Sequence, residues 1–279
     1  MKLDVAVMTR NSGRFLERCL NSVEQGIDMN RLIVVDGGST DSTIDIAESH
    51  GAKILSDRGR NLGYARALAI KYVETPWFAF VDSDIQLPTD WQRKVVRYKL
   101  YKAGAVESLP INVAQPGENQ VTETHNQIMN HRYGHVTAYR GRAARGFTGA
   151  TLLRHDIVQD TEIPDLPCCE DWVLTQHVIA KGYNWYRVPV PVKHHDRYSQ
   201  RPERIAQTYA VARALGYMPL SKLLAKSTFA LLARLAVATF YLNPSYLLHR
   251  VTYTRHALDG WLHPHRYLDM KYPGWEAPQ

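Results

Sequence analysis

Two aspartates, Asp82 and Asp84, directly follow the apolar run Trp-Phe-Ala-Phe-Val at residues 77–81. An uninterrupted apolar run of this kind is typical of a strand that is buried on both faces. Residues two apart in an extended segment point the same way, so both carboxylates could face one point. Hard divalent cations such as Mg²⁺ take one or two carboxylates together with substrate phosphates. The same residues also suit an Asp-rich turn, because Asp and Ser are common in turns.

Two kinds of apolar pattern alternate along the chain and predict the strands and helices that must position these aspartates. Short, mainly apolar runs predict buried strands, and apolar side chains at helical spacing follow each of the early runs. The predicted strands are residues 3–8, 32–35, 52–55 and 77–81, and the helices between them lie at 12–23, 42–47 and 62–73. Strands that alternate with helices across short turns predict a parallel, doubly wound sheet.

Polar residues stand at the carboxyl ends of three of these strands. Thr9 and Arg10 follow the first strand, Asp36 follows the second, and Asp82 with Asp84 follows the fourth. Open parallel sheets bind ligands beyond the carboxyl ends of their strands. Because three strand ends deliver polar groups to the same edge, we favour a binding site over an Asp-rich turn.

The turn after Asp36, Gly37-Gly38-Ser39-Thr40, limits the kind of nucleotide chemistry. It has neither the spacing of a Rossmann phosphate loop nor the Gly-Lys-Ser/Thr ending of a P-loop. Neither hydride transfer nor P-loop ATP chemistry is therefore supported. Asp36 could accept hydrogen bonds from a base or from ribose hydroxyls. The alternative is that Asp36 is a turn acceptor that closes residues 37–39.

Several segments resemble, in the same order, the motifs of one enzyme family. They are the run Ile-Val-Val-Asp-Gly-Gly-Ser-Thr-Asp-Ser-Thr at 33–43, the opening segments 7–11 and 15–20, Asn-Leu-Gly-Tyr-Ala-Arg-Ala at 61–67, Asp82-Ser83-Asp84, and Glu170-Asp171. Together they resemble, respectively, the nucleotide-binding segment, the opening, a slightly shortened helix start, the Asp-x-Asp metal motif and the acceptor-side Glu-Asp motif of family 2 glycosyltransferases. The resemblance covers roughly residues 3–200.

The resemblance implies a fold, a reaction and a donor site. The fold is the GT-A fold, a Rossmann-like mixed, mostly parallel α/β sheet flanked by helices, here with a C-terminal helical extension. The reaction is hexosyltransferase-like, inverting transfer from a UDP- or GDP-sugar to a hydroxyl or lipid-phosphate acceptor in glycan or glycolipid synthesis. Met8-Thr9-Arg10-Asn11 replaces the family's usual Pro-Thr-Tyr-Asn, which leaves uracil and guanine both open. The implied donor-binding residues are Thr9, Arg10, Asp36, Arg66, Asp82 and Ser83.

The resemblance also implies a bound Mn²⁺ or Mg²⁺. Asp84 and Asp82 would hold the ion, together with a histidine that follows the strand predicted at 184–188. His194 and His195 stand where the family often places a metal-ligating histidine. Adjacent residues on a strand face opposite ways, so we expect only one of them to serve, and we choose His195.

Glu170 and Asp171 are implied to face the acceptor. In inverting transfer, one carboxylate takes the proton from the acceptor hydroxyl as it attacks the anomeric carbon, and the metal stabilises the leaving nucleoside diphosphate. We expect Asp171 to be this base and Glu170 to orient it or the acceptor. With a lipid phosphate, already an anion, Asp171 would chiefly position the acceptor. The alternative is that both residues stabilise the N-terminus of a helix.

Composition sets further bounds on the function. A hydrophobic content of 45% and a charged content of 22% are ordinary for a soluble globular protein. The net charge of +7 favours an anionic partner, such as a nucleotide diphosphate, an anionic lipid or a nucleic acid. Three cysteines without paired spacing indicate a reduced, cytoplasmic setting and no zinc site. The chain opens on an apolar strand without a signal-peptide pattern, so we expect no export.

Two other functions are alternatives. A sugar nucleotidyltransferase would need a Gly-rich, Arg-containing signature after the first strand, which residues 9–13 do not supply. A non-catalytic basic nucleic-acid-binding protein would concentrate its Lys and Arg in one tract, whereas here they are spread along the chain. We therefore expect no nucleic acid partner.

We expect a catalytic domain over residues 1–203, with a nucleotide-sugar half of about 1–105 and an acceptor half of about 106–203, and a helical extension over 204–279. Within the polar stretch 112–146, the positive run at 140–146 is either a mobile surface loop or a lid that closes on the donor diphosphate or meets an anionic acceptor. The extension could pack on the catalytic domain, form a homodimer, or lie as a basic amphipathic surface in the inner face of the membrane. We favour membrane contact. The uninterrupted apolar stretches of the extension are shorter than the roughly 20 residues that a membrane span needs.

Overall fold

The computed structural model describes residues 1–98, 101–113, 123, 126–127, 134–142, 144–195, 201–240 and 244–268. Met1–Asp196 forms the main part of one compact unit, and Arg197–Lys271 forms a second. The part of the predicted 112–146 loop between residues 114 and 133 lies almost entirely outside the described residues. The domain boundary that we placed after residue 203 stays a prediction.

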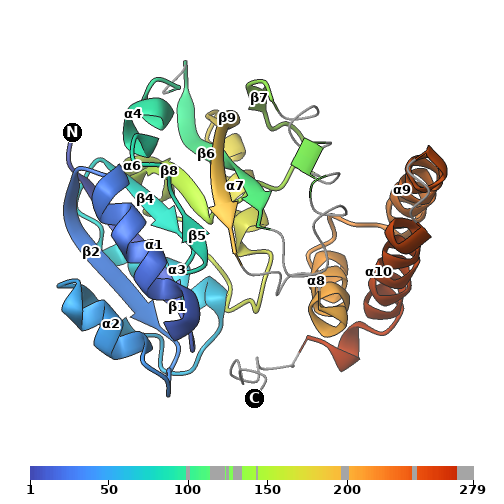
Figure 1. The fold of residues 1–279 in the computed structure, drawn as a ribbon, viewed down its shortest axis with the longest axis horizontal. Helices are drawn as coiled ribbons and strands as arrows, with labels where there is room; N and C mark the ends of the chain where they lie inside the picture. Colours follow the sequence, from blue (N-terminus) through green and yellow to red (C-terminus); the bar gives the residue numbers. More distant parts are fainter. Residues whose placement is uncertain are drawn as a thin grey trace. The chain divides into compact units, whose positions relative to one another are not determined.

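In the first unit, nine strands among the described residues form one sheet (Figure 1). They are β1 (Leu3–Thr9), β2 (Met29–Asp36), β3 (Lys53–Ser56), β4 (Trp77–Val81), β5 (Ile85–Gln86), β6 (Ala103–Asn112), β7 (Thr137–Ala138), β8 (Ala150–Arg154) and β9 (Asn184–His194). The strand order is β3-β2-β1-β4-β8-β6-β9-β5, and β7 pairs with β9. Strands β1 to β4 are parallel, whereas β8 is antiparallel to both β4 and β6. The predicted mixed sheet is confirmed.

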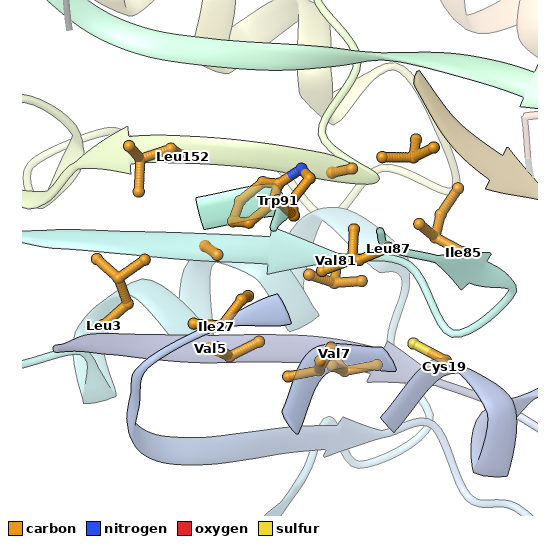
Figure 2. Close-up of a cluster of buried hydrophobic side chains, with 14 of the residues drawn as sticks. Leu3, Val5, Val7, Cys19, Ile27, Val81, Ile85, Leu87, Trp91 and Leu152 are labelled. Carbon is orange, nitrogen blue, oxygen red and sulfur yellow. The ribbon is translucent and has the colours of Figure 1, made fainter. Parts of the chain in front are cut away.

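Helices cover both faces of this sheet (Figure 1). They are α1 (Gly13–Gly26), α2 (Thr43–Ser49), α3 (Leu62–Tyr72), α4 (Trp91–Val96), α6 (His155–Val158) and α7 (Glu170–Ala180). Leu3, Val5 and Val7 of β1 enter the hydrophobic core that also contains side chains of α1 and α4 (Figure 2). Ala6 and Met8 enter a second core with side chains of α3 and α7. Burial on both faces explains why the inner strands are nearly continuous apolar runs.

The strand register brings the polar strand ends to one edge of the sheet. Thr9 of β1 pairs with Asp36 of β2, which pairs in turn with Ser56 of β3. On the other side of β1, Ala6 pairs with Phe80 of β4, two residues before Asp82. The residues that follow β1, β2 and β4 therefore lie next to one another, at the edge where open parallel sheets bind ligands.

The second unit consists of helices in the residues that the structure describes. They are α8 (Pro202–Ala214), α9 (Leu220–Phe240), α10 (Pro244–Leu262) and the short 3₁₀ helix η2 (Pro264–Arg266). Helix α10 packs against both α8 and α9. A Cβ at Gly260 would lie 1.9 Å from the carbonyl oxygen of Ala206, so glycine permits the close approach of α10 to α8. Within the described ranges, no helix is long and apolar enough to cross a membrane.

Candidate active site

Asp36 ends β2 and is held by its own turn. Its Oδ1 accepts hydrogen bonds from Thr9 Oγ1 at 3.0 Å and from Ser39 Oγ at 2.5 Å. Its Oδ2 accepts from the backbone N–H groups of Gly38 and Ser39, both at 2.8 Å. A carboxylate has about four acceptor positions, and these four contacts fill them. The turn-acceptor interpretation accounts for the three contacts from Gly38 and Ser39, whereas the contact from Thr9 comes from β1. A base or ribose would have to replace one of these four contacts.

Arg10 and Asp57 border the same turn. A Cβ on Gly37 would lie 3.2 Å from Asp57 Oδ2 and 3.3 Å from Arg10 Cδ. Burial raises the pKa of Asp57, although the N–H of Gly59 donates to its Oδ1 at 2.7 Å and Arg10 acts in the opposite direction. The sequence reasoning missed Asp57. Its position directly after β3 is the same signal that identified Asp36 after β2.

Arg66 of α3 joins the two carboxylate motifs. Its side chain is buried, with Nη2 donating to Asp82 Oδ1 at 2.7 Å and Nε donating to Glu170 Oε1 at 3.0 Å. The guanidinium carbon also lies 4.7 Å from the centroid of the Phe80 ring. Asp82 follows β4 and Glu170 opens α7, so one arginine links the strand end to the start of this helix. The sequence had placed Arg66 beside the nucleotide without assigning it these partners.

Asp84 and Asp82, although two residues apart, have different partners. Oδ2 of Asp84 lies 3.0 Å from Nε2 of His194, which ends β9. Strand β5 pairs with β9 so that Ile85 is opposite His194, and this register brings the two side chains together. Ser83, between the aspartates, has its hydroxyl 3.0 Å from that of Ser12. Among the hydrogen bonds of the described residues, the two carboxylates therefore have different partners.

His195, the histidine that we expected at the metal, lies against other groups. Its Nε2 is 3.1 Å from Gln86 Oε1, and its Nδ1 is 3.1 Å from Arg18 Nη1. Arginine can only donate, so Nδ1 of His195 accepts and its Nε2 donates to Gln86. Burial lowers the pKa of His195, and the nearby Arg18 lowers it further, which favours this neutral form. The imidazole that faces Asp84 is that of His194.

The described residues contain no cluster of three or more His, Cys, Asp or Glu side chains that could hold a metal ion. The pair of Asp84 and His194 nevertheless offers one carboxylate oxygen and one imidazole nitrogen, 3.0 Å apart. Two ligand atoms would have this separation if each lay about 2.1 Å from one cation and their bonds to it met roughly at a right angle. Cations such as Mg²⁺ often complete their shell with water and substrate phosphates. The pair therefore fits an ion whose remaining ligands come from a diphosphate.

Asp171 lies in the first turn of α7 and is paired with Arg145. Nε of Arg145 donates to Asp171 Oδ1 at 2.6 Å. The same oxygen accepts from the N–H of Trp172 at 2.8 Å, a contact of the kind that the helix-terminus alternative predicts. Burial raises the pKa of Asp171, and Arg145 opposes this rise. The sequence reasoning treated Arg145 as part of a positive run in a surface loop or lid and did not connect it with Asp171.

Glu107 of β6 was also missed by the sequence reasoning. Its buried carboxylate accepts hydrogen bonds from Tyr139 Oη at 2.8 Å, from the N–H of Phe147 at 2.6 Å and from Trp185 Nε1 at 2.6 Å, and it is paired with Arg187. These partners come from separate parts of the chain. A glutamate inside an otherwise apolar strand is the signal that could have identified it, because such a group needs partners when buried.

The segment from Gly146 to Gly149 connects this glutamate to Asp82. The backbone N–H of Asp82 donates to the carbonyl of Gly149 at 2.8 Å. A Cβ on Gly149 would lie 2.5 Å from Asp82 Oδ2, so the absence of a side chain there leaves room for the carboxylate. The N–H of Gly146 donates to Thr175 Oγ1 of α7 at 2.9 Å. This segment therefore contacts both Asp82 and the helix that begins with Glu170 and Asp171.

Comparison with known proteins identifies the family. The family model described as "Glycosyl transferase family 2" matches residues 4–158, more than half of the chain. The chain belongs to glycosyl transferase family 2. The resemblance found in its motifs is thereby confirmed.

Curated relatives of this family 2 chain are similar over part of its length. The putative glycosyltransferase EpsH of Bacillus subtilis is 22% identical over 209 residues, which are 67% of this chain and 59% of EpsH. The SPbeta prophage-derived glycosyltransferase SunS of B. subtilis is 35% identical over 81 residues, 28% of this chain and 19% of SunS. The chain thus spans less than two thirds of the length of these relatives.

Solved structures share the GT-A fold with this family 2 chain. The mannosyltransferase PcManGT from Pyrobaculum calidifontis, in complex with GDP-Man and Mn²⁺, has a TM-score of 0.61 at 15% identity, covering 94% of this chain and 86% of PcManGT. S. aureus TarS 1–349 with UDP-GlcNAc has a TM-score of 0.56 at 17% identity, covering 95% and 92%. Glucosyl-3-phosphoglycerate synthase from Mycobacterium tuberculosis, with Mn²⁺ and UDP, has a TM-score of 0.52 at 18% identity, covering 70% and 72%.

Proposed function

We propose that this family 2 protein is an inverting, divalent-metal-dependent glycosyltransferase that moves a sugar from a UDP- or GDP-sugar to a hydroxyl or lipid-phosphate acceptor. The observation that carries the proposal is the chain of contacts from Asp82 through the buried Arg66 to the buried Glu170. This chain joins Asp82 at the end of β4 to the start of α7. In the proposal, the end of β4 faces the donor and the start of α7 faces the acceptor. A glycosyltransferase needs donor-binding groups and acceptor-binding groups around the same sugar.

The donor would lie at the carboxyl ends of β1, β2 and β4. Thr9, Arg10 and Asp36 are nearest to where the nucleoside would bind, and Ser83 lies between the two aspartates that follow β4. We propose Asp84 and His194, rather than His195, as protein ligands of a Mn²⁺ or Mg²⁺ ion. When bound, such an ion neutralises charge on the leaving diphosphate. The neighbours that bind GDP-Man or UDP together with Mn²⁺ support this choice of cofactor.

The acceptor would meet the start of α7. Asp171 is the general base of the proposal, because its raised pKa makes the carboxylate a better proton acceptor while Arg145 favours the ionised form that a base requires. Glu170 is assigned to orient the site, because the buried Arg66 ties it to Asp82 at the end of β4. If the acceptor is a phosphate, Asp171 positions it and no proton needs to be removed.

Calorimetric titration with UDP and with GDP, each with and without Mn²⁺, tests the donor half of this proposal. We expect one nucleotide to bind in a Mn²⁺-dependent way, and Asp84→Ala and His194→Ala to remove the Mn²⁺-dependent part. His195→Ala is the matched control, because its imidazole contacts Gln86 and Arg18 instead. Loss of Mn²⁺-dependent binding in His195→Ala but not in His194→Ala would reverse the ligand assignment. Failure of both nucleotides to bind with Mn²⁺ present would contradict the donor class.

A further inference from the structure

The net positive charge of the chain comes from one segment of the second unit. The chain has 34 Lys and Arg and 27 Asp and Glu. Residues 204–258 contain no Asp or Glu, so the 27 basic and 27 acidic side chains elsewhere cancel. Lys and Arg are spread along the whole sequence, but the excess of +7 belongs to this helical segment. Its seven basic residues are Arg204, Arg213, Lys222, Lys226, Arg234, Arg250 and Arg255.

Helix α9 of this segment carries an exposed apolar face. Phe229 and Leu232 are 73% and 63% exposed, and Leu224 and Leu235 are exposed as well. The four side chains fall on one broad side of the helix at 3.6 residues per turn, while Leu223 on the other side is fully buried. Single exposed apolar side chains are common on protein surfaces, but large apolar side chains grouped in this way mark an interaction surface.

Helix α10 repeats the arrangement. Leu248 is 67% exposed, and Val251 and Arg255 follow at three and seven residues, also exposed and on the same side of the helix. On α9, Lys222 and the exposed Lys226 are one turn apart and border the apolar face. The long stems of Lys and Arg lie along apolar surfaces while their charged ends reach outward. Both helices therefore combine exposed apolar side chains with cations.

Three kinds of partner could cover this surface, and the observations favour one. A nucleic acid would use the cations but would leave Phe229, Leu232 and Leu248 in water. A second copy of the chain would cover these side chains but would bring two segments of like charge together. An anionic bilayer takes the apolar side chains into its interface and the cations at its headgroups, and helices in that position need not be long enough to cross it.

We propose that α9, together with the exposed side chains of α10, binds the surface of an anionic lipid bilayer. The proposal goes beyond the transfer reaction and does not depend on which nucleotide the donor carries. Sedimentation of the full chain with vesicles tests it. We expect binding to vesicles of phosphatidylcholine mixed with phosphatidylglycerol, weaker binding to phosphatidylcholine alone, and a fall in binding as the salt concentration rises.

The double substitution Phe229→Gln and Leu232→Gln should abolish most of this sedimentation, because it removes the two most exposed apolar residues among those of α9 whose side chains the structure describes. Glutamine is a good helix former, so the helix itself should persist. The matched control is Tyr101→Gln, which replaces an 80% exposed aromatic residue in the first unit and should sediment as the wild type does. Unchanged nucleotide binding and an unchanged thermal unfolding curve would show that the double variant is folded.

Several results would overturn the proposal. One is equal sedimentation with neutral and anionic vesicles, or none with either. Another is wild-type sedimentation of the Phe229 and Leu232 double variant. A salt-dependent shift of a nucleic acid probe without vesicle binding would assign the surface to nucleic acid. A dimer in light scattering that the double variant disrupts, again without vesicle binding, would assign it to a second copy.

Discussion

The carboxylate of Asp171 is subject to two opposing influences. Burial raises its pKa, and the guanidinium of Arg145 at 2.6 Å counteracts part of that rise. If Asp171 takes the acceptor proton, Asp171→Asn should lower kcat with a hydroxyl acceptor by about 10²- to 10⁴-fold and leave nucleotide binding unchanged in calorimetry. Asp160→Asn, an exposed carboxylate next to Lys181, should keep wild-type kcat. Full activity of Asp171→Asn toward a hydroxyl acceptor would mean that this base assignment is wrong.

If Asp171 is the general base, Arg145 should determine where the acidic limb of the pH–rate profile lies. The base acts in its ionised form, so activity is lost as the pH falls through the pKa of Asp171. Arg145→Ala removes the cation that lowers this pKa, so the acidic limb of kcat should move to higher pH. Arg142→Ala, an exposed arginine of the same segment, should leave the limb in place. An acidic limb that stays in place in Arg145→Ala as well would exclude Asp171 as the titrating group.

Sequence reasoning placed the polar residues at one edge but could not choose their partners. Asp36, Asp82 and Asp84 follow strands, and strand order alone brings them together. The link from Asp82 to Glu170 through Arg66 depends on a helix and a strand end that are far apart in the sequence, and no local pattern encodes it. The choice of His194 depends on the β5–β9 register, which sequence periodicity does not determine.

At the scale of elements, Glu107 holds β6, β9 and the segment around Phe147 together. Glu107→Ala leaves the largely buried Arg187 without this partner and removes the acceptor for two N–H groups. The expected cost is about 3–5 kcal/mol in the free energy of unfolding, measured with denaturant. Glu74→Ala, which breaks an exposed pair with Arg31, should cost less than about 1 kcal/mol. Similar costs for the two substitutions would show that the Glu107 cluster does not stabilise this part of the fold.

The parallel strands were predictable because their apolar runs alternate with amphipathic helices over short distances. The second half of the sheet was not. Strand β8 begins at Ala150, and the backbone before it bonds to Glu107 and Thr175 instead of a neighbouring strand. Strand β8 also runs antiparallel between β4 and β6, a placement that depends on pairing between distant segments.

At the scale of the whole molecule, charge and chemistry belong to different parts of the chain. Outside residues 204–258 the basic and acidic side chains are equal in number. Attraction of the proposed anionic donor should therefore depend on local groups, such as Arg10, and on the proposed metal ion, not on the net charge of the first unit. The excess charge is therefore available for the lipid surface proposed for α9. This division predicts that donor binding and surface binding can be changed separately.

Neutralising Lys222 and Lys226 together provides the test of this separation. Each cation near an anionic bilayer contributes about 1 kcal/mol, so Lys222→Gln with Lys226→Gln should weaken vesicle partitioning roughly thirtyfold at low salt. Nucleotide affinity and kcat with a water-soluble acceptor should not change, because neither lysine belongs to the first unit. The control, Lys2→Gln with Lys71→Gln, removes the same charge from exposed sites of the first unit and should affect neither property. If the control weakens partitioning as much as the α9 pair does, net charge rather than the α9 face would be responsible for the attraction.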